Sequence, residues 1–403
     1  MTEFVSALLL QSGYNAALVA IGSALLGLAA GGTGTFVFLR KRALISDAAA
    51  HSTLPGIGLA FIIMVALGGD GRNLFGLIAG SALSAIIGLL VVDWITKSTR
   101  LPEDAAIGAV LSVFFGFGIV LLTVIQTMSA GKQAGLEGYL LGSTAGMLFQ
   151  EAVTIAVVGA VAAIALLVLH RRMIVVAFDP EYAETMGFGV RATDLMTMGL
   201  VLLVTVIGLK VVGLILIVAL LIIPPVTARF WTNRVDRLVT IAAVAGGLAA
   251  YIGAALSAAY PKVPTGAIIV LVSFVMFAIS FLLAPERGLV GSLLRHLRFQ
   301  YRVHRRQGLL ELARGETIYD RTTLKVLHNA GYLRGDGVAT LSGRAAAAQE
   351  LRNDARWEIA RKRNIEFADA TRFDGLSQID SVLTADEIAE IDAELSRQIG
   401  AVS

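Results

Sequence analysis

Long apolar runs separated by short polar connections dominate the first 284 residues of the chain. A bilayer core about 30 Å thick needs roughly 20 apolar residues for each spanning helix. We predict helices over residues 14–38, 44–68, 74–96, 104–127, 147–169, 194–210, 212–230, 237–259 and 266–284. The sixth and seventh runs could form one broken span. The pattern therefore predicts an all-α polytopic membrane protein with about nine transmembrane helices.

Positively charged residues in the connections predict how the chain is oriented, because Lys and Arg are retained on the cytoplasmic side of short loops. With the N-terminus outside, the inward connections hold twelve such residues and the outward connections hold four. The inward residues are Arg40, Lys41, Arg42, Lys97, Arg100, Arg171, Arg172, Arg191, Arg229, Arg234, Arg237 and Arg287, and the outward ones are Arg72, Lys132, Lys210 and Lys262. This asymmetry predicts an N-out, C-in protein with a cytoplasmic tail.

Composition agrees with lipid as the main solvent of the first part of the chain. Hydrophobic residues make up 56% and charged residues 16% of the sequence, and the mean hydropathy is +0.76. Residues 1–288 carry 30 of the 63 charged residues, whereas the 115 residues that follow carry 33. We therefore predict a transmembrane domain at 1–288, a basic juxtamembrane linker at 289–306 and a soluble domain at 307–403. The absence of cysteine excludes disulfides and thiolate metal sites.

The linker and the tail differ in character from the spans. Five arginines between positions 295 and 306 are typical of a solvated helix held near anionic lipid headgroups. Short apolar helices and the glycine-rich stretch GYLRGDGVATLSGR follow, and the glycines predict a tight turn between short strands. The turn glycines are Gly331, Gly335 and Gly337, and the predicted strand residues are Tyr332, Leu333, Val338, Thr340 and Leu341. Two helices and a small hairpin outline an α+β winged helix.

Asp47 and His51 stand four residues apart near the start of the second predicted helix, in RKRALISDAAAHSTLPG. On a helix this spacing places both side chains on one face, one turn apart. A carboxylate oxygen and an imidazole nitrogen could bind one divalent cation, and a dimer would double these ligands. A local ion pair is the competing interpretation, because Asp is also favoured in the first turn of a helix. The spacing alone leaves both interpretations open.

The long inward connection HRRMIVVAFDPEYAETMGFGVRAT predicts a short helix at the membrane surface. Asp179 is a favourable N-cap, Pro180 suits the first helical position, and Glu181 suits the positive end of the helix dipole. Gly187 and Gly189 can end the helix. The pattern by itself favours an ordinary amphipathic loop helix.

Two adjacent prolines, Pro224 and Pro225, lie inside the seventh apolar run. Proline removes a backbone donor and breaks a helix. Such breaks persist within membranes where neighbours or a cavity satisfy the freed backbone groups. We therefore expect a helix break at this point.

Several stretches resemble the membrane permeases of ABC importers for manganese, zinc and iron. They are GTFVFLRKRALISDAAAHSTLPGIGLAF, EDAAIGAVLSVFFGFGIVLL, GYLLGS, AFDPEYAETMGFGV and VVGLILIVALLIIPPVTAR, and the resemblance covers residues 14–288. It implies that Asp47 and His51 lie on the translocation pathway and take part in metal coordination. It also implies that the surface helix is the coupling helix that docks into a groove on the ATPase. The matching residues there are Asp179, Pro180, Glu181, Tyr182, Ala183, Gly187 and Phe188.

The same resemblance implies a permease subunit of the inner membrane, with no catalytic residues and no permanently bound cofactor. The implied partners are a cytoplasmic ABC ATPase dimer, a second permease of the same or a sister chain, an extracytoplasmic metal-binding protein and membrane lipids. Manganese, zinc and iron all suit an Asp and a His. ATP hydrolysis belongs to the partner, because the sequence contains no GxxxxGK[ST] phosphate loop.

The tail resembles the winged-helix domain of iron- and manganese-dependent repressors from about Leu309 to Glu394, through TLKVLHNAGYL, ATLSGRAAAAQELRNDARWEI and IDSVLTADEIAEI. Where that family has a Glu-His pair of metal ligands, this chain has Asp380 and Ser381. The tail also balances 17 basic against 16 acidic residues, which is no strong nucleic-acid footprint. A protein contact near the ATPase is therefore the preferred role, and DNA binding is disfavoured.

Two other classes of function compete with an ABC permease. A secondary, ion-coupled metal transporter would work without an ATPase, but that class usually places several carboxylates in the bilayer. This chain offers chiefly Asp47 and Asp93. A membrane-anchored transcription regulator would rest on the tail alone.

Overall fold

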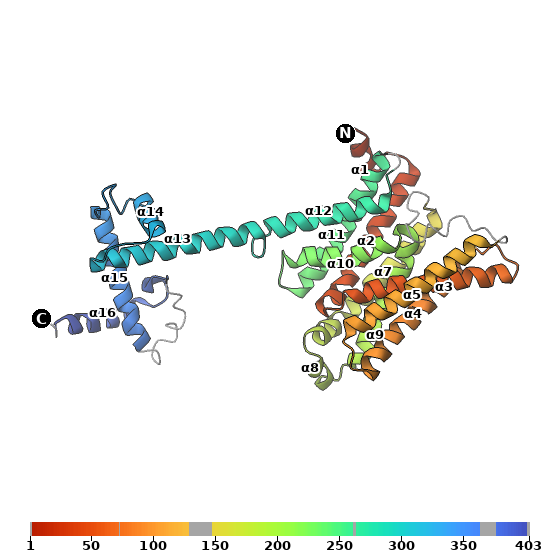
Figure 1. Cartoon of the computed structure of the whole chain (residues 1–403), viewed down its shortest axis with the longest axis horizontal. Helices are drawn as coiled ribbons and strands as arrows, with labels where there is room; N and C mark the ends of the chain where they lie inside the picture. Colours follow the sequence, from red (N-terminus) through yellow and green to blue (C-terminus); the bar gives the residue numbers. More distant parts are fainter. Residues whose placement is uncertain (1, 72, 129–146, 261–262, 363–375, 401–403) are drawn as a thin grey trace. The chain divides into compact units, whose positions relative to one another are not determined.

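A computed structural model describes residues 2–71, 73–128, 147–260, 263–362 and 376–400 of the chain (Figure 1). The chain divides into two compact units, Met1–Gly291 and Ser292–Ser403. The stretch GYLLGS, Lys132 and Lys262 lie outside the described residues.

The first unit is built from helices. In chain order they are α1 (Thr2–Leu8), α2 (Tyr14–Leu39), α3 (Leu44–Ala66), α4 (Leu74–Ser98), α5 (Glu103–Thr127), α7 (Phe149–Phe178), α8 (Pro180–Thr185), α9 (Val190–Val212), α10 (Leu214–Arg229), α11 (Val235–Ala259) and α12 (Thr265–Leu283). Each predicted apolar run corresponds to one of the helices other than α1 and α8. Most boundaries agree within about four residues, because hydropathy changes sharply where a span ends.

Helix lengths bear on the predicted number of spans. Among the described residues, eight helices are long and apolar enough to cross a membrane, namely α2, α3, α4, α5, α7, α9, α11 and α12. Helix α10 is apolar but has 16 residues, fewer than the roughly 20 that a simple span needs. The count of nine spans and the N-out orientation therefore stay predictions.

The break in this part of the chain lies at Gly213 and not at the prolines. Gly213 separates α9 from α10 with φ 84°, a backbone conformation that glycine adopts without strain. Pro224 and Pro225 lie within α10, so the expected helix break is wrong. Pro225 cannot donate to the carbonyl of Leu221, and the backbone at Gly34 packs directly on that oxygen, where a Cβ would clash. A neighbouring helix therefore covers the group that the proline leaves without its intrahelical donor.

Helix α2 is central to the first unit and packs on α7, α9, α10 and α11, whereas α3 packs on α4, α5 and α9. Small residues permit the closest approaches. A Cβ on Gly27 of α2 would clash with the carbonyl oxygen of Gly246 on α11, and a Cβ on Gly56 of α3 would clash with that of Gly80 on α4. Close backbone contact replaces the hydrophobic driving force that helices lack in lipid.

The second unit contains most of α13 (Leu289–Arg314), then α14 (Arg321–Asn329), α15 (Leu341–Lys362), a 3-10 turn at Ile379–Ser381 and α16 (Ala385–Gly400). It has two apolar clusters. One joins the end of α13 to α14 and α15 through Leu309, Leu327 and Ala347. The other surrounds Trp357 with residues of α15, the 3-10 turn and α16.

The predicted strands of the tail are wrong for the residues that the structure describes. A tight turn is present, with positive φ at Gly331 and Gly337, but only an isolated antiparallel bridge joins Leu333 to Ala339. Leu341 begins α15 and is not in a strand. The physical reason is Thr340, whose hydroxyl oxygen accepts a hydrogen bond from the backbone of Gly343 at 3.0 Å and so caps the helix where the second strand would continue.

Candidate functional site

The predicted Asp47–His51 pair is formed on the first two turns of α3. The His51 Nε2 atom lies 3.2 Å from Asp47 Oδ1, and the side chains are 18% and 32% exposed. The small residues between them, Ala48, Ala49 and Ala50, are fully buried against neighbouring helices. The predicted placement of both side chains on one face is therefore confirmed, at a position that is half-buried.

The second ring nitrogen of His51 has no partner in the part of the chain that the structure describes. Its Nδ1 atom is buried without a hydrogen bond to any of the described residues, and the hydroxyl of the adjacent Ser52 is in the same state. The ring packs edge-on against Phe115 of α5, with centroids 4.9 Å apart. Buried polar atoms without partners are uncommon and costly, so this part of α3 is suited to a group that the chain itself does not supply.

Two ligands are too few for a closed metal site. Within the described ranges, no group of three or more His, Cys, Asp or Glu side chains converges on one point. A cation at Asp47 and His51 would need water, backbone oxygens or residues of another chain to complete its coordination. Such an open arrangement suits an ion that must both enter and leave. The other carboxylate considered, Asp93, pairs with Lys97 of its own helix at 2.6 Å.

Helix α8 is capped at both ends as its sequence predicts. The Asp179 carboxylate accepts a hydrogen bond from the backbone of Tyr182 at 2.9 Å, and Pro180 occupies the first helical position. Gly187, with φ 78°, follows the last turn, where Phe188 donates its backbone N–H to Ala183 at 2.9 Å. Local capping therefore defines this short helix on its own.

The faces of α8 differ in exposure. Ala183 is fully buried and anchors the helix, while Tyr182 and Met186 are 52% and 56% exposed. Glu181 is also exposed, and Phe188 is half-buried beneath the Arg172 guanidinium at 5.8 Å. An exposed face with two large apolar side chains on a short, well-capped helix is suited to contact with another protein.

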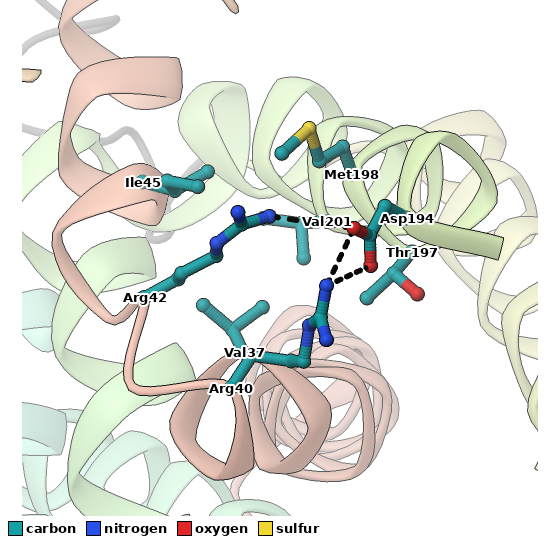
Figure 2. Close-up of a pocket in the computed structure, with 8 residues that line it drawn as sticks. All are labelled: Val37, Arg40, Arg42, Ile45, Asp194, Thr197, Met198 and Val201. Atoms are coloured by element: carbon teal, nitrogen blue, oxygen red, sulfur yellow. Dashed lines mark hydrogen bonds and ion pairs between the residues drawn. The ribbon is translucent and has the colours of Figure 1, made fainter. Parts of the chain in front are cut away.

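A cluster that sequence reasoning missed lies beside the start of α3. Figure 2 shows Arg40 and Arg42, from the turn between α2 and α3, converging on Asp194 of α9. The Arg40 Nη2 atom lies 2.6 Å and 2.5 Å from the two carboxylate oxygens of Asp194. Arg42 lies 3.0 Å from Glu103 at the start of α5 and 3.7 Å from Asp194. The available signal was an acidic residue, Asp194, within an otherwise apolar run.

In the tail, the Arg356 guanidinium lies between two acidic side chains, Asp380 and Asp392. Asp380 lies 3.1 Å from Arg356, and the same guanidinium donates to Asp392 at 2.7 Å and 2.5 Å. These hydrogen bonds lower the pKa of the Asp392 carboxyl and raise that of Arg356. A guanidinium therefore joins α15, the 3-10 turn and α16 at this position.

Comparisons with known proteins match the part of the chain that forms the first unit. The ABC 3 transport family matches residues 14–284. The manganese transport system membrane protein MntC of Bacillus subtilis is 39% identical over 298 residues, which is 74% of this chain and 67% of that protein. The zinc transport system membrane protein TroC of Treponema pallidum is 35% identical over 289 residues, which is 72% of this chain and 95% of that protein.

A solved structure of PsaBC from Streptococcus pneumoniae in complex with Fab is also similar. Its TM-score is 0.62 at 28% sequence identity, and the match covers 74% of this chain and 99% of the solved chain. The arrangement of helices in the first unit is therefore one that a solved protein also adopts.

Proposed function

This chain belongs to the ABC 3 transport family, and we propose that it lines the path by which a divalent metal ion crosses the membrane in an ATP-driven importer. It is a multi-pass membrane permease subunit and not an enzyme, since its relatives are transport-system membrane proteins and a separate ATPase hydrolyses ATP. The observation that carries the proposed path is the Asp47–His51 pair on α3, with an imidazole nitrogen that has no hydrogen-bond partner among the described residues.

Manganese, zinc and iron are the proposed substrates. Each accepts carboxylate and imidazole ligands, and the names of two relatives favour manganese and zinc. The ion is a passing substrate held by few protein ligands, because tight closed coordination would slow its release. No permanently bound cofactor is part of the proposal.

A second permease, of the same or a sister chain, would complete the site. Two copies of α3 facing one another would supply two carboxylates and two imidazoles, which suffices for the four-coordinate arrangement that zinc prefers. An extracytoplasmic metal-binding protein would deliver the ion at the opposite side from the ATPase.

Helix α8 is the proposed docking element for the ATPase dimer. The charge asymmetry of the connections supports its cytoplasmic placement, in an inner-membrane protein whose N-terminus is outside and whose C-terminus is inside. The exposed Tyr182 and Met186 would enter a groove on the ATPase, while the buried Ala183 keeps the helix attached to α7 and α9.

The tail is proposed to be cytoplasmic and to contact protein near the ATPase. Its helical core and tight turn support a degenerate winged-helix domain over residues 307–403, without the hairpin strands. Asp380 is engaged by Arg356, which argues against a metal-sensing role. Helix α13 carries exposed Leu293, Leu294 and Leu297 beside its arginines, a composition suited to the anionic lipid surface.

Uptake of a radioactive divalent metal by the reconstituted importer tests the proposal. We expect uptake by the wild-type complex with ATP, and its loss when Asp47→Ala is combined with His51→Ala. Asp93→Asn, which removes a carboxylate paired with Lys97, serves as the matched control and should transport normally. Uptake by the double variant at the wild-type rate would show that the ion takes another path, and uptake without the ATPase would favour a secondary transporter.

A further inference from the structure

The turn between α2 and α3 has an unusual backbone. Arg42 and Lys41 donate their N–H groups to the carbonyls of Val37 and Phe38 at 3.0 Å each, the two hydrogen bonds with which helices commonly end. The residue in the left-handed position is normally glycine, but here it is Lys41, with φ 58°. Residues other than glycine rarely adopt this backbone conformation unless the surroundings enforce it. The turn therefore holds Arg40 and Arg42 on either side of a constrained residue.

Arg40 joins the two helices that flank α8. Its Nη1 atom donates to the carbonyl of Val176, in the last turn of α7, at 2.6 Å. That carbonyl would normally accept from the residue four positions later, which is Pro180 and has no N–H. The same guanidinium binds both oxygens of Asp194 near the start of α9. Because Pro180 has no N–H to donate, the Val176 carbonyl is free to accept the hydrogen bond from Arg40.

Arg42 extends the cluster to α5. Its ion pair with Glu103 joins the turn to the first residue of α5, the helix whose Phe115 packs on His51. Five residues after Arg42, α3 presents Asp47. The cluster therefore connects the end of α7 and the start of α9 with α3, which carries the Asp47–His51 pair, and with α5, which packs on His51.

We propose that Arg40, Arg42, Asp194 and Glu103 form an ionic clamp that transmits movement of α8 to the start of α3 and so couples ATP hydrolysis to passage of the metal. The inference rests on the proposed function and assigns positioning residues to it. Coupling between distant sites is carried by ionic networks and packed elements. Charge-assisted hydrogen bonds, such as those from Arg40 Nη2 to the two oxygens of Asp194, are roughly twice as strong as hydrogen bonds between neutral groups. Arg40 and Asp194 are 16% and 22% exposed, so that solvent weakens their attraction less than at an open surface.

The test compares metal uptake with ATP hydrolysis in proteoliposomes that contain the complete importer. Asp194→Asn keeps the shape of the side chain but removes its charge. We expect ATP hydrolysis within about two-fold of wild type, and a ratio of metal transported to ATP hydrolysed that falls about ten-fold, within the usual range of coupling between sites. Equilibrium metal binding should be unchanged, because Asp47 and His51 are intact.

Arg40→Lys is the second variant, because it keeps the charge but replaces the two Nη atoms, which bind Val176 and Asp194 separately, with a single ammonium nitrogen. It should show a smaller fall in the same ratio. The control is Arg191→Gln, which removes an exposed positive charge from the first turn of α9 and should leave the ratio unchanged.

An unchanged ratio in both clamp variants would overturn the proposal. Failure of both variants to assemble with the ATPase would also overturn it, since the cluster would then serve folding alone. A wild-type complex that hydrolyses ATP but takes up no divalent metal would instead overturn the proposed function, so the two failures are distinguishable.

Discussion

Two polar clusters involve residues at or just before the start of α3, and they differ in how far their hydrogen-bonding capacity is used. In the clamp, Arg40 binds both oxygens of Asp194 and a backbone carbonyl. In the Asp47–His51 pair, one contact of 3.2 Å is made, and a buried ring nitrogen has no partner among the described residues. A satisfied cluster holds helices together, whereas an incomplete one is suited to a ligand from outside the chain.

The difference has an energetic basis. An unpaired buried polar group costs about 1–3 kcal/mol, so a stable fold tends to eliminate it unless function requires it. The clamp bears no such cost, because each guanidinium faces acceptors. Substitutions in the two clusters should therefore have different consequences. Those in the Asp47–His51 pair should weaken metal binding, and those in the clamp should lower stability.

The largest expected effect is on metal affinity. Asp47→Asn should weaken binding of Mn²⁺ to the purified complex by at least about 100-fold, because even the loss of outer-sphere partners costs 10–100-fold. Equilibrium dialysis with a radioactive isotope measures it. Asp194→Asn should bind as wild type does, and a matching loss there would show that the two clusters form a single site.

The next effect is on stability. Arg40→Ala leaves the Val176 carbonyl without its partner and Asp194 with only its 3.7 Å contact to Arg42. We expect a loss of about 2 kcal/mol, below the 3–5 kcal/mol of a fully buried pair because the site is partly exposed. Thermal unfolding of the purified permease measures it. Asp47→Ala should change the unfolding temperature little, and an equal decrease would show that the Asp47–His51 pair is structural.

The tail contains two carboxylates, Asp392 and Asp320, that accept hydrogen bonds as Asp194 does in the clamp, and they should make the stability of the tail depend on pH. Hydrogen bonds from Arg356 lower the pKa of Asp392, and those from the Thr323 hydroxyl and backbone lower the pKa of Asp320 to about 2. A depressed pKa adds stability above the unfolded-state value of about 3.9, which is lost as the pH falls. The tail should therefore unfold at progressively lower temperature between about pH 4 and pH 2.

Fluorescence of the buried Trp357 in the whole protein, with Trp94→Phe and Trp231→Phe, follows this transition. Arg356→Gln should lower the unfolding temperature near neutral pH and flatten its dependence on pH. A profile that is the same with and without Arg356 would contradict the assigned ion pairs.

The smallest expected effect concerns the turn that carries the clamp. Lys41→Gly removes the Cβ from a left-handed backbone conformation, which costs a residue with a side chain about 1–2 kcal/mol. The greater freedom of glycine in the unfolded chain partly offsets this gain. We expect a gain of about 0.5 kcal/mol in thermal unfolding, whereas Lys41→Val should be destabilising. If valine is tolerated as well as glycine, the turn does not hold the arginines under constraint.

Hydropathy alone predicted nine of the helices that the structure describes in the first unit, because each of them is apolar along most of its length. The caps of α8 were equally predictable, since Asp179, Pro180 and Gly187 act on backbone groups within a few residues. Two local predictions were wrong for different reasons. Thr340 caps α15 where the second strand would continue. Helix α10 continues through Pro224 and Pro225, beside the close contact between the Gly34 backbone of α2 and the Leu221 carbonyl.

The sequence by itself determined the helices, the membrane class and the pairing of Asp47 with His51, since these depend on periodicity and on residues one turn apart. Only the tertiary structure decided what each polar group meets. Arg40 and Asp194 are 154 positions apart, and no local pattern joins them to the carbonyl that Pro180 leaves free. Ionic contacts between helices depend on how the helices pack, and in lipid that packing is decided by small residues and close backbone contact along whole helices.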